Sequence, residues 1–149
     1  MHPEPHDEIR TASFRDLGVV TLYAILKLRV DVFVVEQQCA YPELDGRDAE
    51  PDARQLWIAG SDGAVLATLR LLADPDGSAR IGRVATAVSA RGSGLAALLM
   101  QRAIELSTGR VIVLEAQSQL QGWYARFGFE VSGADYLEDG IAHVPMRRA

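Results

Sequence analysis

The spacing of hydrophobic residues changes from helical to strand-like along the first half of the chain. Residues 18–33 place apolar side chains at intervals of three and four, which predicts a helix. The positions on its inward face are Leu22, Ile25, Leu26, Arg29 and Phe33. A loop rich in Pro, Asp and Gly occupies residues 36–54. After it, three apolar runs separated by turn sequences predict an antiparallel meander, with strands at 56–59, 65–72 and 78–86.

The second half of the chain alternates helices with short strands. Residues 94–106 carry leucine and alanine on one face and are followed by Gly109, which predicts an amphipathic helix with a glycine stop. The other predicted elements are a helix at 119–127 and strands at 111–114, 129–131 and 142–146. A meander followed by a βαβ-like crossover indicates a mixed α/β (α+β) sheet, not a doubly wound one.

The length and composition are those of one folded domain. The chain has 149 residues, of which 48% are hydrophobic and 23% are charged, so it can bury a core. We expect a flexible N-terminus at residues 1–12 and a single domain at 13–149. No apolar run approaches the roughly 20 residues that span a bilayer, and the first residues lack the layout of a signal peptide. A cytoplasmic protein without a membrane partner is therefore expected.

Charge and cysteine content restrict the classes of partner. The net charge is −5 and the arginines are scattered, which argues against nucleic acid. An acidic surface attracts cationic amines, although many soluble proteins share this property. Cys39 is the single cysteine, and no Cys/His cluster has metal-ligand spacing, so neither an internal disulfide nor a metal is expected.

The clearest chemical signal is the glycine-containing loop at residues 91–97, which leads directly into the predicted helix. Glycines allow sharp turns, and a helix N-terminus offers unpaired N–H groups, so the loop is suited to a pyrophosphate. The pattern Gly92-x-Gly94-x-x-Ala97, with Glu115 about 20 residues further on, also fits a dinucleotide fingerprint. The meander before the loop and the short chain oppose that alternative. A P-loop is excluded because no Gly-Lys-Ser/Thr follows.

Two motifs together resemble a known family. Residues 91–96, RGSGLA, resemble the Arg-x-x-Gly-x-Ala pyrophosphate loop of the GNAT superfamily of N-acetyltransferases, and residues 123–129, WYARFGF, are similar to its second signature. The stretches at 29–48 and 136–146 resemble the ElaA-type subgroup of that superfamily. One departure is Gln55, where relatives often carry histidine, so no histidine role is expected at that corner.

The resemblance implies both the fold and the donor site. It implies a mixed, mostly antiparallel central sheet of about six to seven strands flanked by helices, with acetyl-CoA as the acyl donor. The strand before the loop would bind the pantetheine arm, and the loop amides would bind the pyrophosphate. Gln117 takes the place of a CoA-contacting asparagine. The implied binding residues are Val84, Ala85, Thr86, Arg91, Gly92, Ser93, Gly94, Leu95, Ala96, Ala97 and Gln117.

Acetyl transfer to an amine needs N–H donors for the developing oxyanion and an acid for the departing thiolate. By resemblance, Tyr124 is the general acid. The alternative for Tyr124 is a core aromatic residue whose hydroxyl is satisfied. The expected oxyanion donor is a backbone N–H near Ala85.

The general base stays open between Glu36, His143 and a chain of water molecules. Glu36 follows the apolar residues 32–35, where desolvation would raise its pKa. Otherwise Glu36 is an acid partner for Arg29, which lies on the apolar face of the first helix and requires one, with a substrate carboxylate as the other candidate. Histidine titrates near neutral pH and can serve as a base, although a lone strand histidine such as His143 is often structural. Cys39 has no local activating base and is expected to be structural.

The predicted function is transfer of the acetyl group of acetyl-CoA to a primary amine, directly within a ternary complex. The alternatives are a non-catalytic acyl-CoA-binding or regulatory module on the same fold and, more distantly, a nucleotide-binding domain. Small amines, polyamines, aminoglycoside-like compounds and protein amines all stay open as acceptors. The acidic loop at 43–52 is expected to be solvated, with a place in the acceptor wall as its alternative. A homodimer through the last strands is compatible with this fold.

Overall fold

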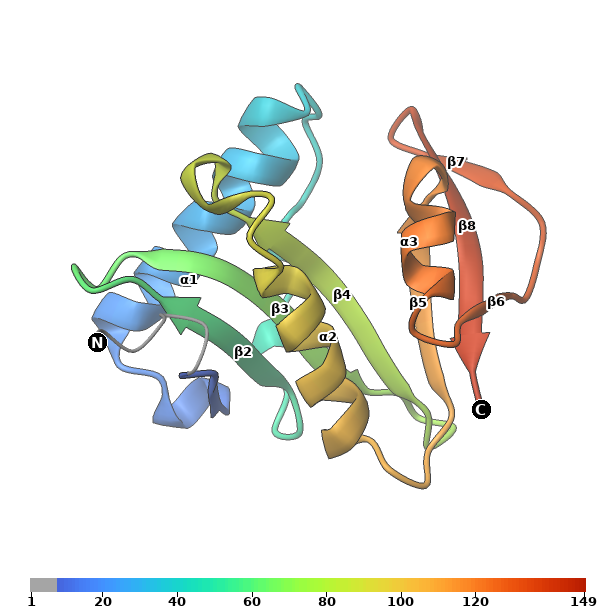
Figure 1. Cartoon of the computed structure of the whole chain (residues 1–149), viewed down its shortest axis with the longest axis horizontal. Helices are drawn as coiled ribbons and strands as arrows, with labels where there is room; N and C mark the ends of the chain where they lie inside the picture. Colours follow the sequence, from blue (N-terminus) through green and yellow to red (C-terminus); the bar gives the residue numbers. More distant parts are fainter. Residues whose placement is uncertain (1–7) are drawn as a thin grey trace.

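The protein is built on an eight-stranded sheet with helices on both faces (Figure 1). The structure, a computed structural model, describes residues 8–149, and the strand count refers to that range. The strand order is β1-β2-β3-β4-β5-β8-β6, and β7 also pairs with β8. The strands are β1 (Arg10–Ala12), β2 (Arg54–Ala59), β3 (Val65–Ala73), β4 (Ala79–Thr86), β5 (Ile112–Gln117), β6 (Glu130–Val131), β7 (Tyr136–Glu138) and β8 (Ile141–Arg148).

The helices divide between the two faces of the sheet. In Figure 1, α2 and α3 lie in front of the sheet and α1 lies behind it. The α-helices are α1 (Val19–Val30), α2 (Leu95–Leu106) and α3 (Gln121–Ala125). Short 3-10 turns are η2 (Phe14–Asp16), η4 (Arg47–Ala49), η5 (Val88–Ala90) and η6 (Ser118–Leu120), and α1 continues into the π-helix η3 (Asp31–Glu36).

The prediction of a mixed, mostly antiparallel α/β sheet flanked by helices is confirmed. Among the described strands, β4 and β5 are the pair that runs parallel. The short strands β1 and β7 were not predicted, and they account for the difference between the six strands predicted along the chain and the eight in the sheet. β1 lies within the segment predicted to be flexible, but its residues Arg10–Ala12 pair antiparallel with β2. Residues 1–7 of that segment lie outside the described residues.

The two halves of the sheet separate between β4 and β5. These strands pair only at Ala79 with Ile112 and at Arg80 with Val113, and beyond Arg80 they diverge (Figure 1). β4 also contains an irregularity opposite β3, because two residues fall where β3 supplies one. Arg83 lies at this bulge and has a positive φ of 53°. The edge of β4 that faces β5 is therefore unpaired over its second half.

Each face of the sheet has its own core. On the α2–α3 face, Leu56, Leu69, Leu99, Met100 and Phe129 belong to one buried cluster. On the α1 face, a second cluster contains Ile25, Leu28, Val32, Trp57 and Ala85. Burial on both sides explains why β3 reads as a nearly continuous apolar run rather than an alternating one.

The acidic loop after η3 is fixed to the sheet by buried arginines. Arg29 is fully buried, and its guanidinium donates to Glu43 and to Asp48, each at 2.6 Å. Arg70 on β3 donates to both oxygens of Asp45 at 2.8 and 3.0 Å. The expectation of a solvated loop is therefore wrong for Glu43 and Asp48, which are 3% and 8% exposed. Because an unpaired buried charge is costly, the acid partners of Arg29 hold this loop against the sheet.

The partner expected for Arg29 also needs correction. Glu36 does not contact it, because η3 carries Glu36 to the far end of β4, where it pairs with another arginine. Gln55, at the position where histidine was noted as common, is buried and donates its amide to Asp48 at 2.8 Å. Gln55 at the start of β2 therefore takes part in the ion cluster around Arg29, and its side chain does not titrate.

Candidate functional site

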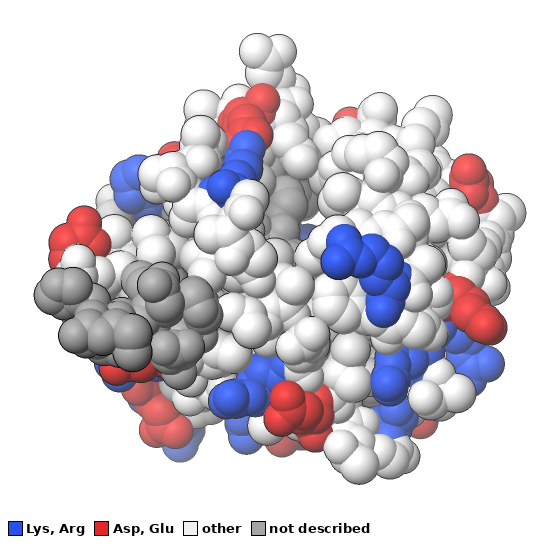
Figure 2. Space-filling model, viewed as in Figure 1, with Lys and Arg blue, Asp and Glu red and all other residues white. Residues whose placement is uncertain are grey.

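A cleft of about 1420 Å³ occupies the gap where β4 and β5 diverge. Residues from both faces of the sheet line it. From the α2–α3 face come Leu95, Leu120, Trp123 and Tyr124, and from the α1 face come Tyr41, Arg83, Glu115, Gln117 and His143. Figure 2 shows the α2–α3 face, where basic and acidic side chains are scattered among uncharged ones and the surface is hollowed between the two halves of the sheet.

The free edge of β4 forms one wall of the cleft. Ala85 and Thr86 pair with β3 on their other side, whereas no residue of β5 pairs with them. An extended chain can therefore add to this edge through backbone hydrogen bonds. Val84, Ala85 and Thr86 all line the cleft, as the resemblance implied.

The glycine loop lies at the end of this edge. Gly92 and Gly94 have φ values of +84° and +81°, which are left-handed conformations that glycine adopts without strain. Gly94 is the N-cap of α2 and provides no side-chain cap, so the first N–H groups of the helix are left for another acceptor. Residues 92–97, with the exception of Ser93, line the cleft. The loop backbone therefore presents unpaired N–H groups at the cleft, and its use as an anion site stays a prediction.

Arg91 is more constrained than the sequence suggested. Its Nη1 and Nη2 donate to the two carboxylate oxygens of Glu36 at 2.7 and 2.6 Å, and its Nε donates to the carbonyl of Thr86 at 3.1 Å. The side chain therefore joins the end of β4 to η3. Ser93 likewise bonds internally, from its hydroxyl to the carbonyl of Ala90 at 2.5 Å.

The environment of Glu36 does not match the one expected of a base. The side chain is 42% exposed, and its hydrogen bonds to Arg91 hold the pKa of Glu36 below its ordinary value. Desolvation by residues 32–35 is therefore not what determines its protonation. The π-helix explains the difference, because its wider turn directs Glu36 toward Arg91 rather than into an apolar pocket.

Tyr124 lies on the α2–α3 side of the cleft. It is 8% exposed and packs edge-to-face against Trp123, with ring centroids 4.9 Å apart, and against Phe129 at 6.5 Å. Within residues 8–149 its hydroxyl has no hydrogen-bond partner, and burial raises the pKa of Tyr124 to about 12. The phenol therefore stays protonated at neutral pH, and the side chain lines the cleft.

His143 lines the cleft from the opposite side of the sheet. It lies on β8 directly across from Gln117 on β5, and its Nδ1 is 2.8 Å from the carbonyl oxygen of Ile141. Because a carbonyl only accepts hydrogen bonds, Nδ1 carries the proton and Nε2 is the acceptor in the neutral ring. The ring stacks on Tyr136 at 5.7 Å, and the hydroxyl of Tyr136 donates to Glu115 at 2.7 Å.

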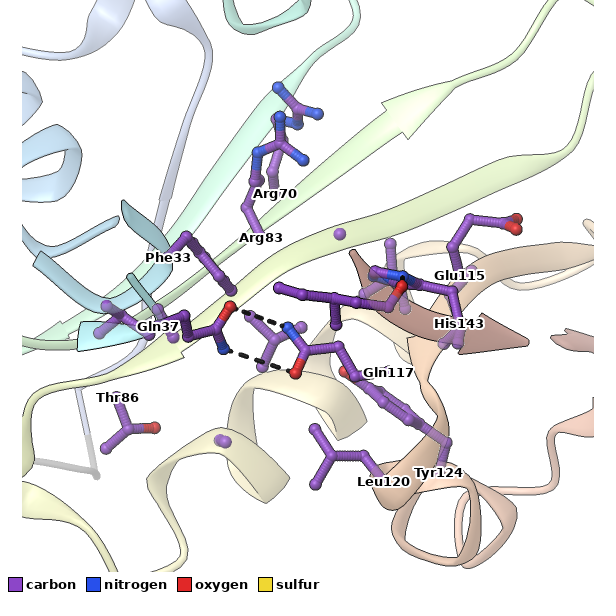
Figure 3. Close-up of a pocket in the computed structure, with 18 of the residues that line it drawn as sticks. Phe33, Gln37, Arg70, Arg83, Thr86, Glu115, Gln117, Leu120, Tyr124 and His143 are labelled. Atoms are coloured by element: carbon purple, nitrogen blue, oxygen red, sulfur yellow. Dashed lines mark hydrogen bonds between the residues drawn. The ribbon is translucent and has the colours of Figure 1, made fainter. Parts of the chain in front are cut away.

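Gln117 has a partner that the sequence did not reveal. Its amide exchanges two hydrogen bonds with Gln37, at 3.2 and 3.4 Å, and also accepts one from Gln119 at 2.9 Å. Figure 3 shows the two glutamine amides facing each other across the cleft. Gln37 is separated from Gln117 by 80 positions, so no local pattern in the sequence could have paired them.

The comparisons with known proteins agree with this geometry. The family model for the acetyltransferase (GNAT) domain matches residues 23–149. The chain belongs to the GNAT family. An acyl-CoA N-acyltransferase from Pseudomonas aeruginosa superimposes with a TM-score of 0.89 at 44% identity, over 95% of this chain and 99% of that one. Escherichia coli ElaA gives 0.88 at 36% identity, over 95% and 99%.

Relatives at the level of sequence place the chain within one part of the GNAT family. A UPF0039 protein of Mycobacterium bovis is 43% identical over 145 residues, which cover 95% of this chain and 93% of the relative. The resemblance to the ElaA-type subgroup is confirmed by the ElaA proteins themselves, at 37% identity over 139 residues for Escherichia coli ElaA. The dinucleotide-binding alternative is wrong, because the loop at 91–97 belongs to a GNAT domain.

The described residues, 8–149, also bear on metal binding and on membrane insertion. No group of three or more His, Cys, Asp or Glu side chains in this range could hold a metal ion. Within the same range, no helix has the length and apolar character to cross a membrane.

Cys39 is buried, and its Sγ lies 3.5 Å from the carbonyl oxygen of Asp139.

Proposed function

We propose that this GNAT protein transfers the acetyl group of acetyl-CoA to a primary amine by direct transfer in a ternary complex. The observation that carries the proposal is the cleft itself, which is lined from both faces of the sheet at the point where β4 and β5 diverge. The anion-binding loop and Tyr124 lie on one side of it, and His143 lies on the other. A donor and an acceptor can therefore approach the same point from opposite faces.

Donor binding would use backbone groups more than side chains. The pantetheine arm would pair with the free edge at Val84, Ala85 and Thr86, and the pyrophosphate would accept from the N–H groups of residues 92–97. Gln117 is within the same cleft and would contact the arm. Arg91 supports the loop through its bonds to Thr86 and Glu36, so its contribution would be to hold the anion site in place and add positive charge beside it.

The transfer step forms a C–N bond and breaks a C–S bond. The amine nitrogen attacks the thioester carbonyl, and a backbone N–H near Ala85 stabilises the oxyanion that develops. As the C–S bond breaks, Tyr124 donates its proton to the departing thiolate, and the amine gives up a proton to a base. The products are an amide and free CoA thiol.

His143 is the base that the structure supports best. Its Nε2 is the acceptor in the neutral ring, and the side chain lines the cleft on the face opposite to Tyr124. Glu36 fits the role less well, because its ion pair with Arg91 lowers its pKa and so weakens it as a base. A water chain ending at His143 is compatible with the same assignment. Cys39 is not proposed as a nucleophile, because it is buried without an activating base beside it.

The acceptor would meet a wall made by the ion-paired loop. Tyr41 lines the cleft, its hydroxyl donates to Glu43, and the guanidinium of Arg83 lies 5.6 Å from the centre of its ring. The buried pairs of this loop keep the wall rigid.

The experiment is a panel of primary amines mixed with acetyl-CoA and the protein, with release of free thiol as the readout and mass spectrometry of the product. Thiol release that depends on one amine class, with acetylation at its nitrogen, would support the proposal. Tight acetyl-CoA binding without amine-dependent thiol release across the panel would favour the non-catalytic acyl-CoA-binding module instead.

A further inference from the structure

The segment that continues α1 forms the boundary of the cleft on the α1 face. Phe33 and Glu36 of the π-helix η3, and its C-cap Gln37, line the cleft, whereas Val35 of the same helix is 65% exposed. A π-helical turn changes which side chains share a face, and such turns recur at functional sites. Glu36 is paired with Arg91. Phe33 and Gln37 are therefore the cleft-lining residues of this segment that have no proposed role so far.

Gln37 is locked in place by its reciprocal amide pair with Gln117. Each amide donates once to the other and accepts once from it, over 3.2 and 3.4 Å. The pair joins η3, which packs with the β4 half of the sheet, to the end of β5. In Figure 3 it crosses the cleft, with Phe33 beside Gln37 and with Tyr124 and Leu120 on the β5 side.

Phe33 is close to the part of β4 where the thioester would lie. It packs against the buried cluster that contains Val32 and Ala85. Ala85 is the position near which the oxyanion donor is proposed, so the aromatic ring borders the space on the α1 side of that point. The amide pair borders the same space from the direction of β5.

We infer that Phe33 and the Gln37–Gln117 amide pair limit the acyl group of the donor to a short chain, the size of acetyl or propionyl. The inference rests on the proposed function and narrows its donor class. A longer acyl chain would have to displace a packed aromatic ring or break two hydrogen bonds without offering new partners to the amides.

The test measures binding of a series of donors, so it needs no knowledge of the acceptor. Calorimetric titrations with CoA, acetyl-CoA, butyryl-CoA and octanoyl-CoA are carried out on the unaltered protein and on Phe33→Ala, Gln37→Ala and Val35→Ala. Val35→Ala is the matched control, because it removes an exposed side chain from the same π-helix. The quantity compared is the ratio of the octanoyl-CoA to the acetyl-CoA association constant, which a general loss of stability would not change.

We expect the unaltered protein to bind octanoyl-CoA at least about tenfold more weakly than acetyl-CoA, since a single methylene difference in a hydrophobic pocket already discriminates by about 10- to 200-fold. Phe33→Ala should raise the ratio by about tenfold or more, and Gln37→Ala should raise it in the same direction. Val35→Ala should leave it unchanged.

Two results would overturn the inference, and they differ from each other. Equal binding of acetyl-CoA and octanoyl-CoA to the unaltered protein would refute the short-chain limit and leave the proposed function standing. Failure of CoA and of all its esters to bind would refute the proposed function, and the inference with it. If Phe33→Ala does not fold, Phe33→Leu and Gln37→Ala provide the same comparison, and an unchanged ratio in both would also refute it.

Discussion

Replacing Tyr124 by phenylalanine removes one hydroxyl and keeps the ring. The ring contacts to Trp123 and Phe129 stay, and the hydroxyl has no hydrogen-bond partner within the described residues. The free energy of unfolding at neutral pH should therefore change by less than about 1 kcal/mol. The free energy of unfolding near pH 7 therefore serves as the control for the kinetic result. Acetyl-CoA affinity should also be nearly unchanged, because the proposed donor site is built mainly from backbone groups.

The effect on turnover should be large if the phenol protonates the thiolate. A positioned general acid contributes about 10²- to 10⁴-fold to a rate, which corresponds to about 3 to 5 kcal/mol of activation free energy. Thiol release with an accepted amine should fall by that factor in Tyr124→Phe, with the KM for acetyl-CoA within about twofold. Unchanged turnover would refute the catalytic role of Tyr124 and leave it only a role in packing.

The raised pKa of Tyr124 adds a second readout. Its folded pKa of about 12 lies above its ordinary value of 10.0, so its contribution to stability is complete below pH 10 and is lost as the pH rises toward 12. At pH 11 the unaltered protein should have lost about 1.4 kcal/mol more of its unfolding free energy than Tyr124→Phe has. Urea unfolding at pH 8 and pH 11 measures this difference, and parallel losses in both proteins would contradict the buried, protonated phenol.

Three further predictions concern the loop, the base and the ion cluster. Gly94→Glu should abolish acetyl-CoA binding in calorimetry by placing a negative side chain at the proposed pyrophosphate site. The control is Gly109→Glu, which has the same left-handed φ of +81° but lies outside the cleft and should bind acetyl-CoA normally. Equal loss of binding in both variants would indicate backbone strain alone. His143→Gln should lower kcat/KM by about 10²- to 10⁴-fold, and an unchanged kcat/KM would exclude His143 as the base. Arg29→Met should cost about 3 to 5 kcal/mol in urea unfolding by leaving buried carboxylates unpaired. Lys27→Met, which removes an exposed ion pair, should cost about 1 kcal/mol or less, and similar costs for the two would contradict the buried cluster.

The elements that depend on local spacing were predictable from the sequence. The meander, α2 and the glycine loop each carry a local signal, because apolar period and turn residues act over a few positions. The short strands β1 and β7 were missed because three-residue strands are too short to show a period. The π-helix was missed for a related reason: its apolar residues continue the pattern of α1, and the sequence does not mark the change of turn.

The contacts that organise the site link distant residues, and these were the least predictable. The acidic partners of Arg29 lie in a loop that composition alone describes as solvated, because charge in a sequence does not reveal whether a buried arginine will reach it. Glu36 and Arg91 are 55 positions apart, and Gln37 and Gln117 are 80 apart. The need of a buried Arg29 for an acid was visible from its place on the apolar stripe, whereas the choice among several nearby acids depended on the path of the chain.

Calorimetric titration of the purified protein with acetyl-CoA, with NAD and ATP as controls, tests the central claim most directly. We expect acetyl-CoA to bind in the micromolar range, at about 8 kcal/mol of binding free energy, and the two nucleotides to bind far more weakly. In the proposed binding mode the loop and the free edge of β4 act together, so both the pyrophosphate and the pantetheine arm should contribute to the affinity. No binding of acetyl-CoA at high concentration, or tighter binding of NAD, would contradict the assignment of the cleft as an acyl-CoA site.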